Sequence, residues 1–249
     1  MKAYLRKISR LGLSLAKANF KLRTEGSYLG VLWYLLDPIL LFTILIFVFG
    51  SNLGAQIKLY PLYLIWGLAL FNFFSAVTSQ ATSVIAGNSL FIKSMKINSE
   101  ALVVSVLFQT IFSHVFELAV LLALMIYWSV SLAGLVFYPA IFLFFALFTL
   151  GVSFILAALG VYVSDLNNVW KFFTQLLFFA TPIFYAASPK WLLALNPLAA
   201  YLTITRGLVI YGQWPGLKII LLIAVVSLAT FVLGWGLFYK VKNKFAENL

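Results

Sequence analysis

Cysteine is absent from this chain of 249 residues, and histidine occurs once. These shortages exclude a disulfide framework, a thiol nucleophile and the clustered Cys and His ligands of zinc sites. Charged residues make up 9% of the chain, against roughly a quarter in ordinary globular domains. What remains is 64% hydrophobic, with a mean hydropathy of +1.07. Such a composition predicts an integral membrane protein.

Sequence motifs for catalysis are also missing. The chain has no G-x-x-x-x-G-K-[ST] phosphate loop, no G-x-S-x-G nucleophile elbow and no H-E-x-x-H pair. Its closest acidic residues, Glu25 and Asp37, stand twelve positions apart, so no local carboxylate pair exists. We therefore expect no enzymatic activity, no bound cofactor and no ATP hydrolysis by this chain. A membrane enzyme would have to assemble its site from carboxylates remote in sequence.

Apolar runs long enough to cross a bilayer recur along the chain. About 20 residues of helix span the hydrocarbon core, and lipid offers the backbone no hydrogen-bond partners, so such runs fold as helices. We predict an all-α integral membrane fold of six transmembrane helices in a single domain over 1–249. The predicted spans lie at about 29–50, 61–82, 101–127, 135–160, 168–186 and 216–239.

The stretch 187–215 differs from the spans. Pro189, Pro197 and Pro215 interrupt it, and its apolar runs are too short to cross a bilayer. We predict two short re-entrant or interfacial helices there, broken at Asn196-Pro197, rather than a seventh span.

Lysine and arginine are unequally distributed. Thirteen of the 17 lie in the first 28 residues, the 83–100 loop, the 161–171 turn and the C-terminal tail. Positive residues are retained on the cytoplasmic side of a membrane. Both termini are therefore predicted to be cytoplasmic, which agrees with an even number of spans.

Residues 1–24 are predicted to form an amphipathic interfacial helix. The apolar residues Tyr4, Ile8, Leu11, Leu15, Ala18 and Leu22 recur at helical spacing on one face, and the basic residues Lys2, Arg6, Lys7, Arg10, Lys17 and Lys21 lie on another. Such a helix lies on an anionic membrane surface. It serves either as a basic flank that fixes topology or as a cuff at the entrance of a translocation path.

The third predicted span carries a polar stripe. Ser105, Gln109, Ser113 and Glu117 recur every four residues, with His114 beside them. Polar groups are costly in hydrocarbon, so the stripe should face protein or water. Two interpretations stand: hydrogen bonding between helices, or the lining of a water-filled path. Asp37-Pro38 in the first span is a second such site, where a proline kink near the entrance and plain interfacial exposure are both open.

Aromatic residues make up 18% of the chain. Their faces can stack on the C–H faces of sugars, although phenylalanine is also an ordinary lipid-facing residue and Trp and Tyr mark membrane interfaces. The aromatic content alone gives slight support to a glycan substrate.

Four segments together give the chain a resemblance to a known family. They are Arg-Thr-Glu-Gly-Ser-Tyr-Leu-Gly-Val-Leu-Trp at 23–33 with Pro38, Gly-Asn-Ser-Leu-Phe-Ile-Lys at 87–93, Thr-Pro-Ile-Phe-Tyr at 181–185, and Asn196-Pro197 followed by Arg206 and Pro215. In order and spacing they resemble the permeases of ABC transporters that export polysaccharides such as O-antigen, capsule and teichoic acid. Two positions depart from the family pattern, Ser164 before Asp165 and Asp37 before Pro38, which leaves their roles open.

The resemblance implies a set of partners. These are a second copy of the chain, two copies of a separate ATPase that binds ATP and Mg, a glycan on a polyprenyl diphosphate, and membrane lipid, with no nucleic acid. The location implied is the bacterial cytoplasmic (inner) membrane.

The resemblance also implies roles for named residues. Asn88, Ser89, Leu90, Phe91, Ile92 and Lys93 would form the coupling helix that docks on the ATPase. Trp33, Tyr34, Asp37, Phe172, Phe173, Phe184 and Tyr185 would line or gate the channel. Arg6 and Arg10 would contact the lipid headgroup, and Asn196, Pro197 and Arg206 would belong to the exit region.

Two other functions remain open. An ABC permease for a small lipid-like molecule or drug would have the same fold. A proton-coupled secondary transporter would use Glu117 and His114 as a proton relay and would have no ATPase partner.

Overall fold

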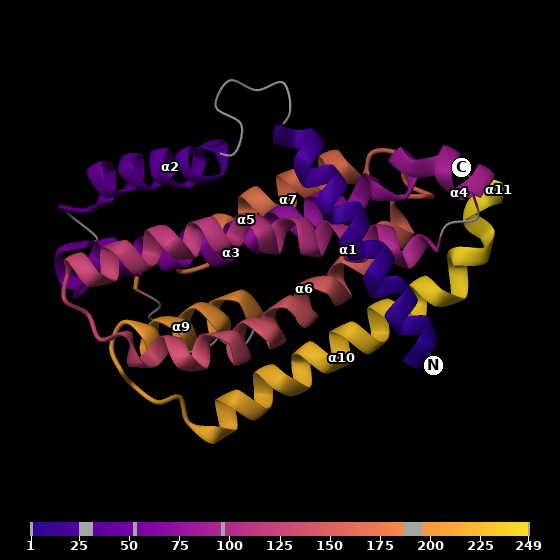
Figure 1. The fold of residues 1–249 in the computed structure, drawn as a ribbon. Coiled ribbons are helices and arrows are strands. Elements are labelled where there is room, and N and C mark those ends of the chain that lie inside the picture. Colours follow the sequence, from indigo (N-terminus) through magenta and orange to yellow (C-terminus); the bar gives the residue numbers. More distant parts are fainter. Residues whose placement is uncertain (1, 25–31, 52–53, 96–97, 187–195, 249) are drawn as a thin grey trace.

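A computed structural model describes residues 2–24, 32–51, 54–95, 98–186 and 196–248, and in these ranges the chain is helical with no β-strand (Figure 1). The helices are α1 (Lys2–Thr24), α2 (Trp33–Phe49), α3 (Tyr60–Val84), α4 (Ser89–Met95), α5 (Ser99–Tyr127), α6 (Tyr138–Leu159), α7 (Leu166–Ala180), α9 (Pro197–Val209), α10 (Leu217–Val241) and α11 (Phe245–Asn248). Short 3₁₀ turns cover Gly54–Gln56, Ala86–Asn88, Leu132–Phe137 and Lys242–Lys244.

Four helical stretches of the described chain are long and apolar enough to cross a membrane. They are Tyr60–Val84, Ser99–Tyr127, Leu132–Leu159 and Leu217–Asn248. Their axes run side by side in Figure 1. The all-helical membrane fold is therefore confirmed, and these four stretches correspond to the second, third, fourth and sixth predicted spans.

The helix α3 forms the centre of the bundle. In the most apolar 18 residues of α3, 78% are buried, whereas in the most apolar 18 residues of the last stretch, Leu217–Asn248, 17% are buried. Helices α2, α5, α6, α7 and α9 all contact it. Aromatic rings pack around its middle, where Phe73 contacts Phe142 and Phe145 of α6.

Helices α6 and α10 cross closely at a pair of glycines. A Cβ on Gly151 would collide with the backbone of Thr230, and one on Gly234 would collide with the backbone of Gly151. Small residues let helices approach in lipid, where packing rather than hydrophobicity holds them together.

Helix α7 ends earlier than the predicted fifth span. It stops at Ala180, and Thr181 is extended with φ −101° and ψ 135°. Thr181 precedes Pro182, and a residue before proline is disfavoured in the helical region. The prediction of a continuous helix over 168–186 was therefore wrong at its C-terminal end.

Helix α9 begins at the predicted break. The side chain of Asn196 accepts a hydrogen bond from the backbone N–H of Leu198 and caps the helix, and Pro197 occupies its first turn. Residues 187–195, where the first of the two predicted short helices would lie, are outside the described residues.

Helix α1 packs obliquely over α5 (Figure 1). Its buried face runs through Ile8, Gly12 and Ala16 to Phe20, whose ring contacts Phe112 and Phe116. Of the predicted apolar face, Ile8 is buried, and Tyr4, Leu11 and Leu15 are partly buried against the core. Ala18 and Leu22 are exposed, whereas Gly12 lies close to Val104 and Ala101 of α5.

The start of α1 and the helix α11 lie at the same end of the bundle, where α11 contacts α4 (Figure 1). The buried Phe245 of α11 packs against Phe238 of α10. Three segments far apart in sequence, α1, α4 and α11, thus share this end of the molecule.

Candidate functional site

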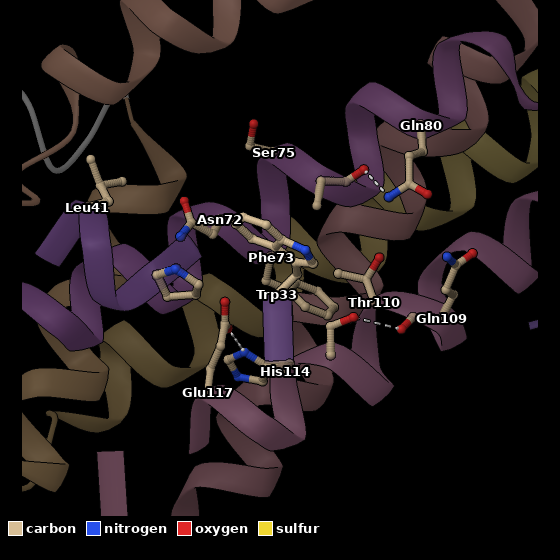
Figure 2. A pocket seen from close by; sticks show the side chains of 13 residues that line it. Trp33, Leu41, Asn72, Phe73, Ser75, Gln80, Gln109, Thr110, His114 and Glu117 are labelled. Carbon is tan, nitrogen blue, oxygen red and sulfur yellow. Dashed lines mark hydrogen bonds and ion pairs between the residues drawn. The ribbon is translucent and has the colours of Figure 1, made fainter. Parts of the chain in front are cut away.

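A cavity of about 360 Å³ lies between α2, α3 and α5 (Figure 2). Its walls carry amides, hydroxyls, one imidazole and one carboxylate, together with the rings of Trp33 and Phe73. Trp33 is 45% exposed, so the cavity opens at the surface of the bundle. A polar cavity among apolar helices is the strongest candidate site in the part of the chain that the structure describes.

Helix α5 supplies one wall through the predicted polar stripe. Gln109, Ser113 and Glu117 are four residues apart, and their side chains line the cavity together with Thr110 and His114. The structure therefore brings the stripe to a polar hollow. Ser105 lies outside it, buried, and its hydroxyl donates to the carbonyl of Leu102.

His114 lies at the centre of a hydrogen-bonded chain. Its Nδ1 is 2.7 Å from Glu117 Oε2, and its Nε2 is 2.6 Å from the Tyr138 hydroxyl of α6. The imidazole stacks on the Phe142 ring, and Trp66 packs edge-on against Tyr138. These contacts fix the orientation of Glu117 at the cavity wall.

Helix α3 supplies the facing wall with Asn72, Ser75 and Gln80. The amide of Gln80 donates to the carbonyl of Ala76. Sequence reasoning missed this wall, although polar residues at positions 72, 75 and 80 interrupt an apolar span and gave a signal.

Several polar groups face the cavity without a partner in the described part of the chain. Among the described residues, the side chains of Asn72, Ser75 and Gln109 make no hydrogen bond, although Gln109 is only 7% exposed. Because these side chains line the open cavity, water or a ligand there can supply their hydrogen-bond partners.

The aromatic channel candidates fall into separate places. Trp33 lines the cavity, whereas Phe172 and Phe173 are exposed on α7. Phe184 is buried and stacks on Phe49 of α2, and Tyr185 is half-buried against it. The side chains of Tyr34 and Asp37 lie outside the described residues.

Arg206 of α9 is buried and joins three segments. Its Nε donates to the carbonyl of Tyr63 at 2.9 Å, Nη1 to that of Pro182 at 2.6 Å and Nη2 to that of Ile183 at 2.8 Å. The guanidinium also lies 3.5 Å from the centre of the Tyr63 ring. It therefore fixes the chain after α7 against α3 and α9. Asn196, whose amide donates to Thr181 Oγ1 at 2.9 Å, fixes the same segment.

The predicted coupling residues form the turn before α4 and its first turns. Leu90 and Phe91 are 80% and 51% exposed, and Lys93 is exposed as well, whereas Ile92 is buried. Ser89 begins α4, and the Asn88 amide donates to the carbonyl of Val84 at 2.8 Å, which closes the end of α3. The short helix thus presents apolar side chains outward from the end of the bundle that holds both termini.

A buried ionic cluster at this end was not expected from the sequence. Glu100 is 1% exposed; its Oε1 lies 2.5 Å from Lys242 Nζ and accepts a hydrogen bond from the Tyr4 hydroxyl at 2.7 Å. Burial raises the pKa of the Tyr4 phenol above its ordinary value, so it stays protonated and donates. The cluster ties α1, α5 and the end of α10 together.

Arg6, Lys7 and Arg10 lie exposed along a shallow hollow on α1 that Leu11 and Ser14 complete. This hollow, of about 470 Å³, is a basic surface at the end that holds the termini. The described residues contain no cluster of three or more metal-ligating side chains.

The fold defines a helical membrane protein. A family model described as ABC-2 type transporter matches residues 11–210, and the chain belongs to that family. The resemblance seen in the sequence is therefore confirmed at the level of the family.

Three curated relatives match nearly the whole chain, and each is named O-antigen export system permease protein RfbA. One from Myxococcus xanthus is 27% identical and covers 95% of this chain and 94% of its own length. Two from Klebsiella pneumoniae are 26% and 29% identical, and each covers 93% of this chain and 92% of its own length.

Proposed function

We propose that this chain is the permease subunit of an ABC transporter that exports a lipid-linked polysaccharide across the bacterial inner membrane. The observation that carries the proposal is the match of the ABC-2 family to residues 11–210, joined by relatives named for O-antigen export along almost the whole chain. The apolar helices of the fold fit that location.

ATP is hydrolysed by a separate subunit in this proposal. The chain has no phosphate loop of its own, so ATP and Mg bind to the partner. Leu90, Phe91 and Lys93 of α4 project outward beside the termini and would dock on that subunit. Motion of the ATPase would then reach α1 and α10 through the Glu100 cluster.

The membrane arrangement proposed is six spans with both termini in the cytoplasm. Helices α2 and α7 supply the first and fifth spans, and the region around α9 is re-entrant on the outer side. Two copies of the single domain, 1–249, would enclose the channel, with exposed rings such as Phe172 and Phe173 on α7 facing its interior.

The basic hollow on α1 would attract the polyprenyl diphosphate of the substrate. Arg6 and Arg10 lie exposed along it, and a basic helix face at an anionic membrane surface favours phosphate. Reversal of both residues to Glu should reduce export, measured as surface glycan. Unchanged export would contradict this contact.

Deletion of the chain in its native cell and affinity purification together test the function. We expect surface polysaccharide to disappear on deletion, and a P-loop ATPase to co-purify in stoichiometric amount with the intact chain in gentle detergent. Phe91→Asp should reduce that co-purification, because it places a charge in an apolar contact, whereas Phe173→Asp on α7 should not. Intact surface glycan after deletion, or no ATPase with the intact chain, would overturn the proposal.

A further inference from the structure

The cavity between α2, α3 and α5 has the chemistry of a sugar site, and we propose that it binds one sugar ring of the exported glycan. The proposal rests on the proposed export function and adds a substrate contact inside a single protomer. The cavity is lined by Trp33, Asn72, Ser75, Gln109 and Glu117, among other residues.

The free hydrogen-bonding groups of the cavity match sugar hydroxyls. The amides of Asn72 and Gln109 and the hydroxyl of Ser75 make no hydrogen bond within the described chain. A primary amide both donates and accepts, as a sugar hydroxyl does. Glu117 adds an acceptor, because only its Oε2 contacts His114 and no described residue donates to its Oε1.

The described part of the cavity wall disfavours a phosphate group as the ligand. Within the described chain no Lys or Arg side chain lines it. The imidazole of His114 is engaged at both nitrogens, by Glu117 and by Tyr138. A carboxylate facing an unneutralised phosphate would repel it, so the described wall favours a hydroxyl-rich group over a phosphate.

Aromatic surface and size complete the match. The ring of Trp33 lines the same cavity as the amides and can stack on the C–H face of a sugar (Figure 2). The volume of about 360 Å³ is near the lower end of small-ligand pockets, roughly 300–1,000 Å³. The site therefore suits one ring with some water, and the half-exposed Trp33 leaves room for the rest of the glycan to extend outward.

The absence of cysteine allows a direct test in the full chain. Ser113→Cys places one thiol on the cavity wall, and Val115→Cys places one on the outer, 57% exposed surface of the same helix. A water-soluble methanethiosulfonate reagent attacks thiolate, which requires water around the sulfur. We expect Ser113→Cys to react and Val115→Cys, facing lipid, to remain unlabelled.

Protection by sugars then tests binding. A ligand at ten times its dissociation constant leaves about one cavity in eleven free, so labelling of Ser113→Cys should slow about tenfold. One arm compares vesicles from the native strain with vesicles from a strain that lacks the first glycosyltransferase of glycan synthesis. The other adds free glucose, galactose, mannose or N-acetylglucosamine, with glycerol 3-phosphate as the anionic control. Protection in the first arm alone identifies the lipid-linked glycan as the source of the ring, and protection in the second extends the site to free sugar.

Two results would overturn the sugar site. One is a Ser113→Cys variant that reacts no faster than Val115→Cys, and the other is a labelling rate that neither glycan nor any sugar changes. If surface glycan still depends on the chain in that strain, only the site fails. If surface glycan persists after deletion of the chain, the export function fails with it.

Discussion

Arg206 offers the sharpest test of how the fold is held together. Its guanidinium donates to the carbonyls of Tyr63, Pro182 and Ile183 from a fully buried position. Replacement by methionine keeps the approximate length of the side chain but removes all three donors. The carbonyls of Pro182 and Ile183 follow the end of α7 and lie in a non-helical segment, so the loss leaves them poorly satisfied.

The expected loss of stability is the difference between two opposing contributions to the free energy of unfolding. Hydrogen bonds from a charged donor contribute about 1.5–3 kcal/mol each. Burial of the guanidinium costs several kcal/mol, which the variant recovers. We expect Arg206→Met to lower the free energy of unfolding by about 3 kcal/mol, which corresponds to a Tm lower by about 6–12 °C for a chain of this size.

Thermal unfolding of the purified protein in one detergent, followed by size-exclusion chromatography, measures this shift. The Tm of Arg206→Lys should lie between those of the wild type and Arg206→Met, because an ammonium cannot reach three carbonyls as a planar guanidinium does. Lys218→Met, at an exposed position on α10, is the control for loss of positive charge. Equal Tm values for Arg206→Met and Lys218→Met would refute the reasoning.

Three further predictions use the same assay. Gly67→Ala should lower stability by about 1–3 kcal/mol, because its Cβ would collide with the Arg206 guanidinium; a wild-type Tm would mean that the guanidinium moves without cost. Glu100→Gln should lower the free energy of unfolding by about 2 kcal/mol, less than the roughly 3–5 kcal/mol for breaking a fully buried ion pair, because Lys242 is 17% exposed. The double variant with Lys242→Met should lose less stability than the sum of the two single variants, and strict additivity would argue against coupling. Gly151→Val should lower the Tm more than Gly207→Val, because a Cβ at 151 meets the backbone of α10 whereas one at 207 has only one carbonyl oxygen at 3.8 Å; equal Tm values would contradict the close α6–α10 crossing.

Some sites could be located from the sequence because their signal is local. Gln109, Ser113 and Glu117 share a face through helical geometry alone, and Asn196-Pro197 carries the capping residue and the proline of a helix start. Pro182 is a local signal for the end of α7 at Ala180. The apolar residues continue to 186, so hydropathy alone predicted a longer helix.

Other features required the tertiary structure. The second wall of the cavity, Asn72 and Ser75, lies in a different helix from the stripe. The Tyr4–Glu100–Lys242 cluster joins residues 238 positions apart. No spacing rule relates such positions, because helix packing alone brings them together.

The sequence by itself determined that this protein is helical and belongs in a membrane, since apolar length and the shortage of charge decide that without reference to any contact. It did not determine which apolar face is inside. Lipid tails are as apolar as leucine, so burial in protein and exposure to lipid leave similar hydropathy. Helix α3, with hydropathy 1.5, is the buried centre, and the last stretch, with hydropathy 2.5, is mostly on the outside. Only packing between helices decided that arrangement, and with it the position of the polar cavity.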